Sequence, residues 1–218
     1  MNKYLLFIIT GILGCSLPAL AQKKFTEGTI SYDIVINTGS DKSQASNLLE
    51  GATSTVYVKG QRSRTEMVSA LGTQATIIDG TKNTVTIIKE YGDQKYIINL
   101  TPANWKEVNQ KFENVSFTYS NDTKKILGYT CKKAVGKLAD GTTFTVWYTP
   151  ELIPENKDFQ YANRSLPGLA MEYESSLGNL KVTYTVSNIS FNPVPAAKFD
   201  IPHSGYRVMT YEESKGKG

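Results

Sequence analysis

Apolar and polar side chains alternate along most of the chain. The large apolar residues in the first such segment are Ile30, Tyr32, Ile34 and Ile36. A period of two places these four side chains on one face of an extended strand. The alternation recurs at Val56 and Val58, and in residues 115–119, 144–148 and 180–186. The pattern predicts antiparallel strands that each bury one face.

Turn signals lie between these segments. They are Asp79-Gly80, Tyr91-Gly92-Asp93 and Asp140-Gly141. Because Gly, Asp and Asn adopt tight-turn conformations readily, these signals predict hairpins that follow one another along the chain. Ile189 is out of phase with Val186, which predicts a bulge or bend near Asn188.

Helix signals are few. Thr101 is a suitable N-cap, Pro102 suits the first helical position, and Trp105, Val108 and Phe112 follow at helical spacing. They predict one amphipathic helix of about three turns through Phe112. Residues 41–50 are a second, weaker helix candidate, and a loop is an equally good interpretation there.

A sheet with so little helix must find other cover for its apolar face. About nine to eleven strands at a spacing of about 4.8 Å make a sheet more than about 40 Å wide, whereas one helix covers about 10 Å. The sheet can curl until its apolar face meets itself, which produces a closed or half-open barrel. We therefore predict a mainly β fold, a curved antiparallel sheet forming an unclosed half β-barrel, with one or two short helices as plug or lid. A fully packed interior without a cavity is the alternative.

The first 21 residues have the layout of a cleavable secretory signal. Lys3 precedes an apolar run over residues 4–17, and Ala19-Leu20-Ala21 provides the small residues of a cleavage site before Gln22. We expect residues 1–21 to be removed and residues 22–218 to form a single domain in the periplasm or outside the cell, with a flexible tail from about residue 210. The alternative is a lipoprotein anchored to a membrane through Cys15.

The charge of the expected mature chain excludes one class of partner. Residues 1–21 contain one basic and no acidic residue, so the 24 basic and 20 acidic residues of the chain become 23 and 20. The lysines are spread over several short clusters rather than gathered in one stripe. We therefore expect no nucleic-acid partner.

Cysteine and histidine are too scarce for the common catalytic or metal sites. Cys131 is the only cysteine left after cleavage, and His203 is the only histidine of the chain. A zinc site needs several such ligands, and a Ser-His or Cys-His hydrolase needs its histidine beside the nucleophile. We expect no metal, no cofactor and no enzymatic activity. A hydrolase that uses Glu172 and Glu174 is the weaker alternative.

Several motifs resemble known families. Residues 126–134, 147–151 and 166–173 resemble the GLPGLI and DUF4412 families of exported bacterial proteins, and the residues that carry this resemblance are Cys131, Trp147, Pro150, Pro167 and Gly168. Residues 56–64, 77–80 and 196–202 are more distantly similar to periplasmic lipoprotein carriers of the LolA and LolB type. The carrier resemblance implies a LolA-like unclosed barrel with helical plugs and an apolar concave face that shields lipid.

These observations lead to a hypothesis of ligand binding. We expect a non-catalytic envelope protein that holds a lipid, a lipoprotein acyl chain, a lipid-modified peptide or a similar apolar ligand in the half-barrel. The candidate ligand-binding residues are Ile30, Tyr32, Ile34, Tyr96, Trp105, Val108, Phe112, Leu166, Leu169 and Met171. The alternative is an envelope scaffold or interaction module with a packed core, which binds a protein partner through an edge strand or through the loop over residues 150–167.

Overall fold

One large sheet dominates the fold. The computed structural model of the chain describes residues 22–36, 49–177 and 180–216. Its main strands are β2 (Glu27–Ile36), β3 (Thr53–Lys59), β4 (Arg62–Ser69), β5 (Gly72–Asp79), β6 (Thr84–Tyr91), β7 (Gln94–Leu100), β8 (Ser116–Ile126), β9 (Tyr129–Lys137), β10 (Thr143–Thr149), β12 (Leu169–Leu177), β13 (Leu180–Ser190) and β14 (Arg207–Thr210). In the described residues they form a single twelve-stranded sheet, in the order β14-β7-β6-β5-β4-β3-β2-β13-β12-β10-β9-β8.

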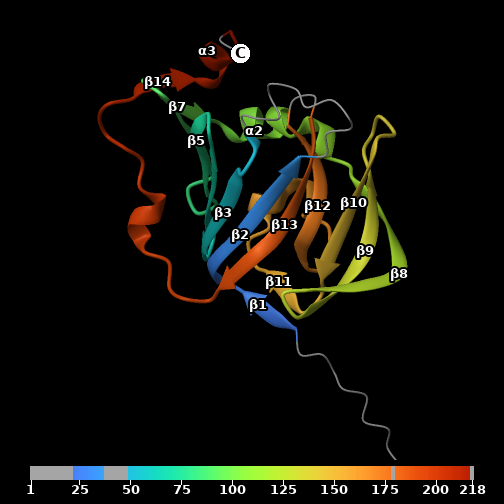
Figure 1. The fold of residues 1–218 in the computed structure, drawn as a ribbon. Coiled ribbons are helices and arrows are strands. Elements are labelled where there is room, and N and C mark those ends of the chain that lie inside the picture. The colour runs from blue at the N-terminus through green and yellow to red at the C-terminus, as the bar shows by residue number, and fades with distance from the viewer. Residues whose placement is uncertain (1–21, 37–48, 178–179, 217–218) are drawn as a thin grey trace, which may run out of the picture.

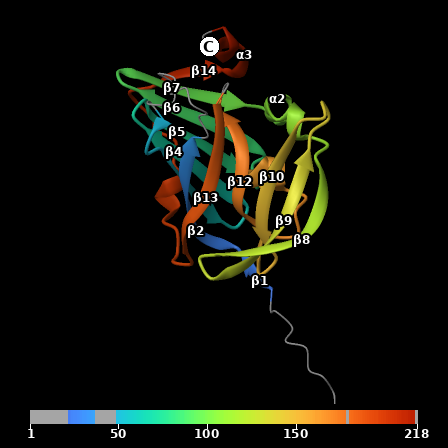
Figure 2. The same cartoon turned by 45° about the vertical axis from the view of Figure 1, so that its right-hand side comes forward.

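The sheet curves without closing. Neighbouring strands are antiparallel, except that β14 runs parallel to β7. The two edge strands, β14 and β8, do not pair with each other within the described residues. Figures 1 and 2 show the resulting open, curved sheet. The prediction of a mainly β fold with an unclosed antiparallel sheet is confirmed.

Short elements complete the fold. β1 (Lys23–Phe25) pairs in parallel with β11 (Leu152–Pro154) in a separate two-stranded sheet. The helices are α2 (Pro102–Val108), η1 (Gln110–Phe112), η2 (Asp158–Asn163), η3 (Ala196–Phe199) and α3 (Tyr211–Lys215), of which the three η elements are 3₁₀ helices. Among the described residues, every helix is too short or too polar to cross a membrane.

The alternation of β2 produces the buried face that the sequence predicts. Ile30, Tyr32 and Ile34 are buried, whereas Asp33 is exposed. We call the face of the sheet that carries the three buried residues the inner face, and the opposite one the outer face. The pairing between β13 and β2 shifts register between Val186 and Asn188, which confirms the predicted bulge near Asn188.

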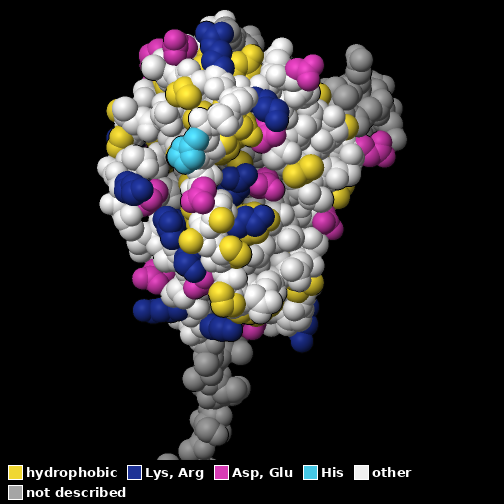
Figure 3. Space-filling model, turned by 90° about the vertical axis from the view of Figure 1, so that its left-hand side faces the viewer, with side chains coloured by type: hydrophobic (Ala, Val, Ile, Leu, Met, Phe, Trp, Pro, Cys, Tyr) yellow, Lys and Arg dark blue, Asp and Glu magenta, His cyan; other side chains and the backbone are white. Residues whose placement is uncertain are grey.

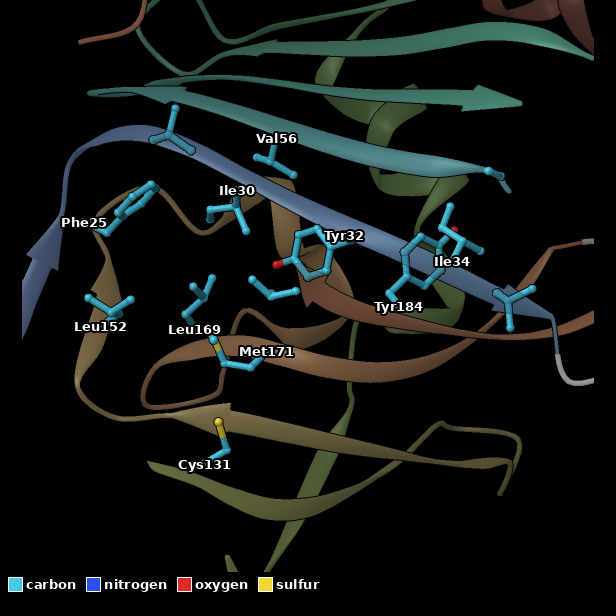
Figure 4. Close-up of a cluster of buried hydrophobic side chains, with 14 residues drawn as sticks. Phe25, Ile30, Tyr32, Ile34, Val56, Cys131, Leu152, Leu169, Met171 and Tyr184 are labelled. Atoms are coloured by element: carbon cyan, nitrogen blue, oxygen red, sulfur yellow. The ribbon is translucent and has the colours of Figure 1, made fainter. Parts of the chain in front are cut away.

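The main hydrophobic core lies on the inner face, over strands in the middle of the sheet. It joins Phe25 of β1 and Leu152 of β11 to β2, β12 and β13, and its central side chains are almost wholly shielded from solvent. Figure 4 shows Ile30 and Tyr32 of β2 pointing towards Leu169 and Met171 of β12. The Tyr32 hydroxyl crosses this interior and donates a hydrogen bond to the carbonyl of Ala170, with 3.0 Å between the oxygens.

The segments α2, η1 and η2 cover other parts of the inner face. Trp105 of α2 packs on a second core cluster over β5, β6 and β7, which Met209 of β14 completes. The chain between β11 and β12 carries η2, which lies against β4. There the Gln160 side chain donates to the carbonyl of Gly168 and accepts from the amide of Ala170. Helical segments therefore act as the predicted plug.

The outer face is covered at one side by residues 191–206, which we call the C-terminal strap. Tyr206 packs on a small cluster formed by Ala75, Ile77, Ile88 and Ile97. The Phe199 ring lies beneath the Arg62 guanidinium, 4.9 Å from its central carbon. Figure 3 looks onto this side of the molecule and shows charged side chains of both signs around small hydrophobic patches, with the exposed His203 among them.

The predicted helix after Thr101 is shorter in the structure. It has the expected cap but ends at Val108, because Asn109 leaves the helical conformation at φ −100° and ψ 10°, and the 3₁₀ helix η1 then runs to Phe112. In the segment from about residue 210, for which the sequence predicted a flexible tail, the structure has α3, capped by Thr210 and Glu213. The expected signal peptide, the alternative anchor at Cys15 and most of the helix candidate over residues 41–50 lie outside the described residues.

Candidate functional site

Two cavities lie on the inner face. The first has a volume of about 170 Å³, and its walls are Lys111, Phe112, Leu138, Thr142, Thr143, Phe144, Ala162, Asn163, Tyr173, Glu174, Ser175, Ser176 and Lys181. The second has a volume of about 220 Å³, and its walls are Ser54, Thr65, Met67, Gln74, Thr76, Tyr173, Ser175 and Tyr184. Because Tyr173 and Ser175 border both cavities, we treat them as one site and call it the inner groove.

The strand alternation explains why these residues face the groove. Ser54 is in phase with Val56 on β3, and Thr65 pairs with Val56 on β4. Thr76 pairs with Thr65 and is in phase with Ile78 on β5. On these three strands the inner face therefore carries hydroxyl side chains beside apolar ones. Ser54, Thr65 and Thr76 are the hydroxyl residues of these strands that line the second cavity.

Three tyrosines form the wall between the groove and the main core. The rings of Tyr173 and Tyr184 are stacked, with 4.9 Å between their centroids and 6° between their planes. Tyr32 meets both rings edge-on. Burial raises the pKa of Tyr184 to about 12 and that of Tyr173 well above its ordinary value. These hydroxyls therefore remain protonated, and the wall that they form is neutral at physiological pH.

The segments that border the first cavity are joined by one acidic side chain. The Tyr161 hydroxyl of η2 donates to Oε1 of Glu113, which directly follows η1. Nη2 of Arg164 lies 3.5 Å from Oε2 of the same carboxylate, and the Arg164 guanidinium lies over the Tyr161 ring at 4.1 Å. Trp105 of α2 meets the Tyr161 ring edge-on, with 6.0 Å between centroids. We call Glu113, Tyr161 and Arg164 the latch.

The latch is expected to weaken in acid. The hydrogen bond from Tyr161 is the largest cause that lowers the pKa of Glu113 below its ordinary 4.5, and the charge of Arg164 acts in the same direction. A carboxyl with a lowered pKa in the folded state stabilises it above the unfolded-state pKa and loses this contribution as the pH falls through the folded-state pKa. We predict that Trp105 fluorescence changes below about pH 4.5. The measurement uses Trp147→Phe protein, in which Trp105 is the sole tryptophan.

The matched variant for this acid transition is Glu113→Gln. The amide still accepts a hydrogen bond from Tyr161, but it does not titrate. The transition in Trp105 fluorescence should therefore disappear in the variant. An identical acid transition in Glu113→Gln protein would contradict the assignment to Glu113.

The predicted ligand-binding residues divide into three groups in the structure. Ile30, Leu166, Leu169 and Met171 are completely buried among other side chains, and Tyr32 and Ile34 belong to the same packed interior. Tyr96 and Trp105 pack on the cluster over β5, β6 and β7, and Val108 is 40% exposed. Of the ten residues, Phe112 borders the inner groove.

The sequence patterns had not indicated the polar residues of the groove. Ser54, Thr65 and Thr76 stand at positions where strand alternation calls for inward-facing side chains, yet they are not apolar. A polar residue at an inward-facing position was the signal that could have identified them. The sequence contains no such signal for Asn163, because this residue reaches the groove from a 3₁₀ helix in a long connection.

For several of the motif residues, the structural surroundings explain why that residue type is present. Cys131 is completely buried, and burial raises the pKa of its thiol to about 11, which keeps it unreactive at neutral pH. Trp147 is partly buried against the main core cluster, with the Lys124 ammonium 4.5 Å from its ring centroid. Gly168 lies against the carbonyl of Thr149, beside Pro150, with Pro167 preceding it. The glycine is therefore needed for a close approach of two strands.

The two candidate catalytic carboxylates are each engaged by another group. Glu172 is paired with Lys124 at 2.7 Å, and Glu174 accepts a hydrogen bond from the amide of Thr145. His203 is exposed in the C-terminal strap. Within the described part of the chain, no three His, Cys, Asp or Glu side chains come together in a way that could hold a metal ion.

The fold and the groove together define the chain as an unclosed antiparallel β domain with a hollowed inner face. Residues 33–157, more than half of the chain, match the family described as "N-glycanase peptide, N-terminal domain". The chain therefore belongs to this family. The motifs of the sequence had not indicated it.

Solved structures with a similar course of the chain are distant in sequence. PNGF-II is 14% identical, with a TM-score of 0.47 over 88% of this chain and 34% of that one, so this chain spans about a third of its length. An uncharacterised conserved protein from Thermus thermophilus is 10% identical, with a TM-score of 0.49 over 84% and 91% of the two chains. LprF from Mycobacterium bovis is 11% identical, with a TM-score of 0.33 over 77% and 88%. A comparison with curated proteins found no match.

Proposed function

We propose that this domain is a non-catalytic binding module of the cell envelope, and that its half-barrel holds a lipid, a lipid-modified peptide or another ligand with a substantial apolar part. The inner groove carries the proposal, because its two cavities share a wall on the concave side of the sheet. Ligand sites are typically concave, largely preformed and lined mainly by apolar and aromatic side chains with a few polar groups.

The proposed location of the protein in the cell envelope rests on the sequence. The leader pattern that ends at Ala21 and the resemblance of residues 166–173 to the exported GLPGLI and DUF4412 families both favour an extracytoplasmic protein. The likeness of residues 56–64 to LolA-type carriers favours a lipid or lipoprotein ligand.

A long acyl chain requires more room than the two cavities offer. An internal cavity of about 150 Å³ holds one benzene-sized molecule, so each cavity takes a ring or a short aliphatic segment. The segments that could make way are η1 and η2. Beyond the latch, η2 contacts the sheet mainly through β4 and through Gln160. We therefore propose that η2 moves away from the sheet when a long ligand enters.

Filling the groove should prevent ligand retention. In Thr65→Phe protein the new ring occupies the second cavity from β4, and we expect at least a tenfold lower yield of bound ligand. Native mass spectrometry of protein purified from its host, before and after organic extraction, measures the yield. The matched control is Thr55→Phe, which places the same ring on the outer face of the neighbouring strand. Equal ligand yield from both variants, or a bare polypeptide mass in wild-type protein, would rule out the proposed site.

The alternative, an interaction module, is favoured by the open edge of the sheet. β8 is an edge strand, and its Tyr119 is 52% exposed. An unpaired edge can accept a strand from a partner. Recovery of one envelope protein in stoichiometric amount, lost on Thr118→Pro substitution in β8 and unaffected by Thr65→Phe, would favour this function over ligand binding.

A further inference from the structure

The second cavity of the inner groove is lined by hydrogen-bonding side chains. Six of its eight lining residues carry a hydroxyl, and Gln74 carries an amide. The six are Ser54, Thr65, Thr76, Tyr173, Ser175 and Tyr184. Among the described residues, these hydroxyls have no hydrogen-bond partner in the protein. Buried polar groups are nearly always hydrogen-bonded, so the contents of the cavity must provide the partners.

Three of the lining groups are set to donate. Oε1 of Gln74 already accepts a hydrogen bond from the Tyr91 hydroxyl at 3.1 Å, which leaves the NH₂ of that amide to donate into the cavity. Burial raises the pKa values of Tyr173 and Tyr184, so both hydroxyls keep their protons. The cavity therefore favours contents that accept hydrogen bonds.

The two tyrosine hydroxyls suit a single acceptor. Tyr173 and Tyr184 occupy directly paired positions on β12 and β13, and their rings are stacked with 6° between the planes. Their hydroxyls therefore project side by side, and the proximity of Tyr184 contributes to the raised pKa of Tyr173. A carbonyl oxygen has two lone pairs and can accept from two such donors.

The polar lining contains no cation. Ser54 and Tyr184 are buried, at 5% and 9% exposure, and none of the eight lining residues is charged. The charged residues of the groove, Lys111, Glu174 and Lys181, border the first cavity and are exposed to solvent. An unpaired carboxylate or phosphate in the second cavity would cost far more free energy than a neutral carbonyl that accepts hydrogen bonds. The favoured acceptor is therefore neutral, as in an ester or an amide.

The first cavity provides apolar walls beside this polar site. Phe112, Leu138 and Phe144 border it, and Tyr173 and Ser175 border both cavities. A carbonyl in the second cavity therefore has an apolar space next to it for an attached alkyl segment. The volumes of about 220 and 170 Å³ suit a carbonyl group with a short chain.

We propose that the inner groove recognises a neutral acyl group, whose carbonyl oxygen accepts hydrogen bonds from the tyrosine hydroxyls of the second cavity while its alkyl chain lies against Phe112 and Phe144. The inference rests on the proposed function and names the part of the ligand that the groove selects. The carbonyl belongs either to the ester of a glycerolipid or to the amide of an acylated peptide. A free fatty acid, which is ionised at neutral pH, is disfavoured.

The first test compares methyl octanoate, N-methyloctanamide and sodium octanoate, which share one acyl chain. Each is titrated into ¹⁵N-labelled protein at neutral pH. We expect the ester or the amide to shift the amide resonances of Tyr173, Ser175 and Tyr184, and to bind at least tenfold more tightly than octanoate. Equal or tighter binding of octanoate would overturn the inference.

Variants of the stacked tyrosines test the proposed hydrogen bonds. The double variant Tyr173→Phe and Tyr184→Phe keeps both rings and removes both hydroxyls, so it should weaken binding of the neutral probe about tenfold or more. It should fold normally, because neither hydroxyl bonds to a described residue, and urea denaturation checks this. Tyr96→Phe removes a hydroxyl that bonds to Gln94 outside the groove, and it should leave binding unchanged. Unchanged affinity of the folded double variant would contradict the proposed contact.

The second test distinguishes the source of the acyl group and separates this inference from the proposed function. The probes are 1-monooctanoylglycerol, which has an ester, and N-octanoylglycinamide, which has amides. Tighter binding of the first supports a glycerolipid, and tighter binding of the second supports an acylated peptide. If no neutral octanoyl probe binds but protein from the host carries an extractable ligand, the inference fails and the proposed function stands. A bare polypeptide from the host together with no binding of any probe overturns both.

Discussion

Replacing Gly168 with Ala should be among the most destabilising single-methyl changes in this chain. An added Cβ would lie 2.0 Å from the carbonyl oxygen and 2.7 Å from the carbonyl carbon of Thr149. Both are backbone atoms at the end of β10, where its pairing with β12 is already irregular, so they cannot turn aside as a side chain would. We expect a loss of about 3 kcal/mol or more in the free energy of unfolding, measured by urea denaturation.

Two other glycines calibrate this measurement. A Cβ at Gly216 would meet nothing within 4 Å, so Gly216→Ala should change stability by less than about 0.5 kcal/mol. A Cβ at Gly136 would lie 2.4 Å from the Phe144 ring, which can rotate away, so the cost there should be intermediate. A Gly168→Ala protein as stable as Gly216→Ala protein would show that the approach of Thr149 relaxes easily.

Truncating Leu169 is the second substitution for which we expect a large effect. Leu169 is completely buried and belongs to the cluster that joins β12 to Phe25 and Met171. Leu169→Ala removes three carbon atoms from a packed interior and leaves a cavity, which typically costs about 2–5 kcal/mol. Urea denaturation should show a lower midpoint with an unchanged slope, because the surface exposed on unfolding stays nearly the same.

The control for the Leu169→Ala substitution is the same substitution at an exposed leucine. Leu71, in the turn between β4 and β5, is 46% exposed, and Leu71→Ala should change stability by no more than about 0.5 kcal/mol. If Leu169→Ala protein binds ligand less well at temperatures where it is fully folded, Leu169 also contributes to the ligand site. Unchanged binding would restrict its role to the core.

Local patterns predicted the strands better than they predicted the site. Alternation identified the buried face of β2, and the change of phase after Val186 located the bulge, because both depend on neighbouring residues in one strand. Alternation does not reveal what covers a face. η2 is brought onto β4 by tertiary packing, and no spacing along the sequence encodes that contact. Leu169 therefore looked like a cavity residue although it is packed.

The polar part of the groove was partly predictable. Ser54 follows the inward phase of Val56 and Val58, and a hydroxyl at such a position indicates either a satisfied core residue or a wet surface. The choice between these depends on the distance to the opposite wall. Tyr173 and Tyr184 form that wall, and they come from strands more than 100 residues further along the chain.

The pairing of β2 with β13 has a consequence for how the chain reaches its native state. The strands from β3 to β7 and from β8 to β10 form hairpins between close neighbours, whereas β2 and β13 lie about 150 residues apart in sequence. Contacts of such long sequence separation form late and slow folding. Until β13 is available, one side of β2 remains an unpaired edge. During synthesis, the protein should therefore depend on a chaperone until almost its whole length has emerged.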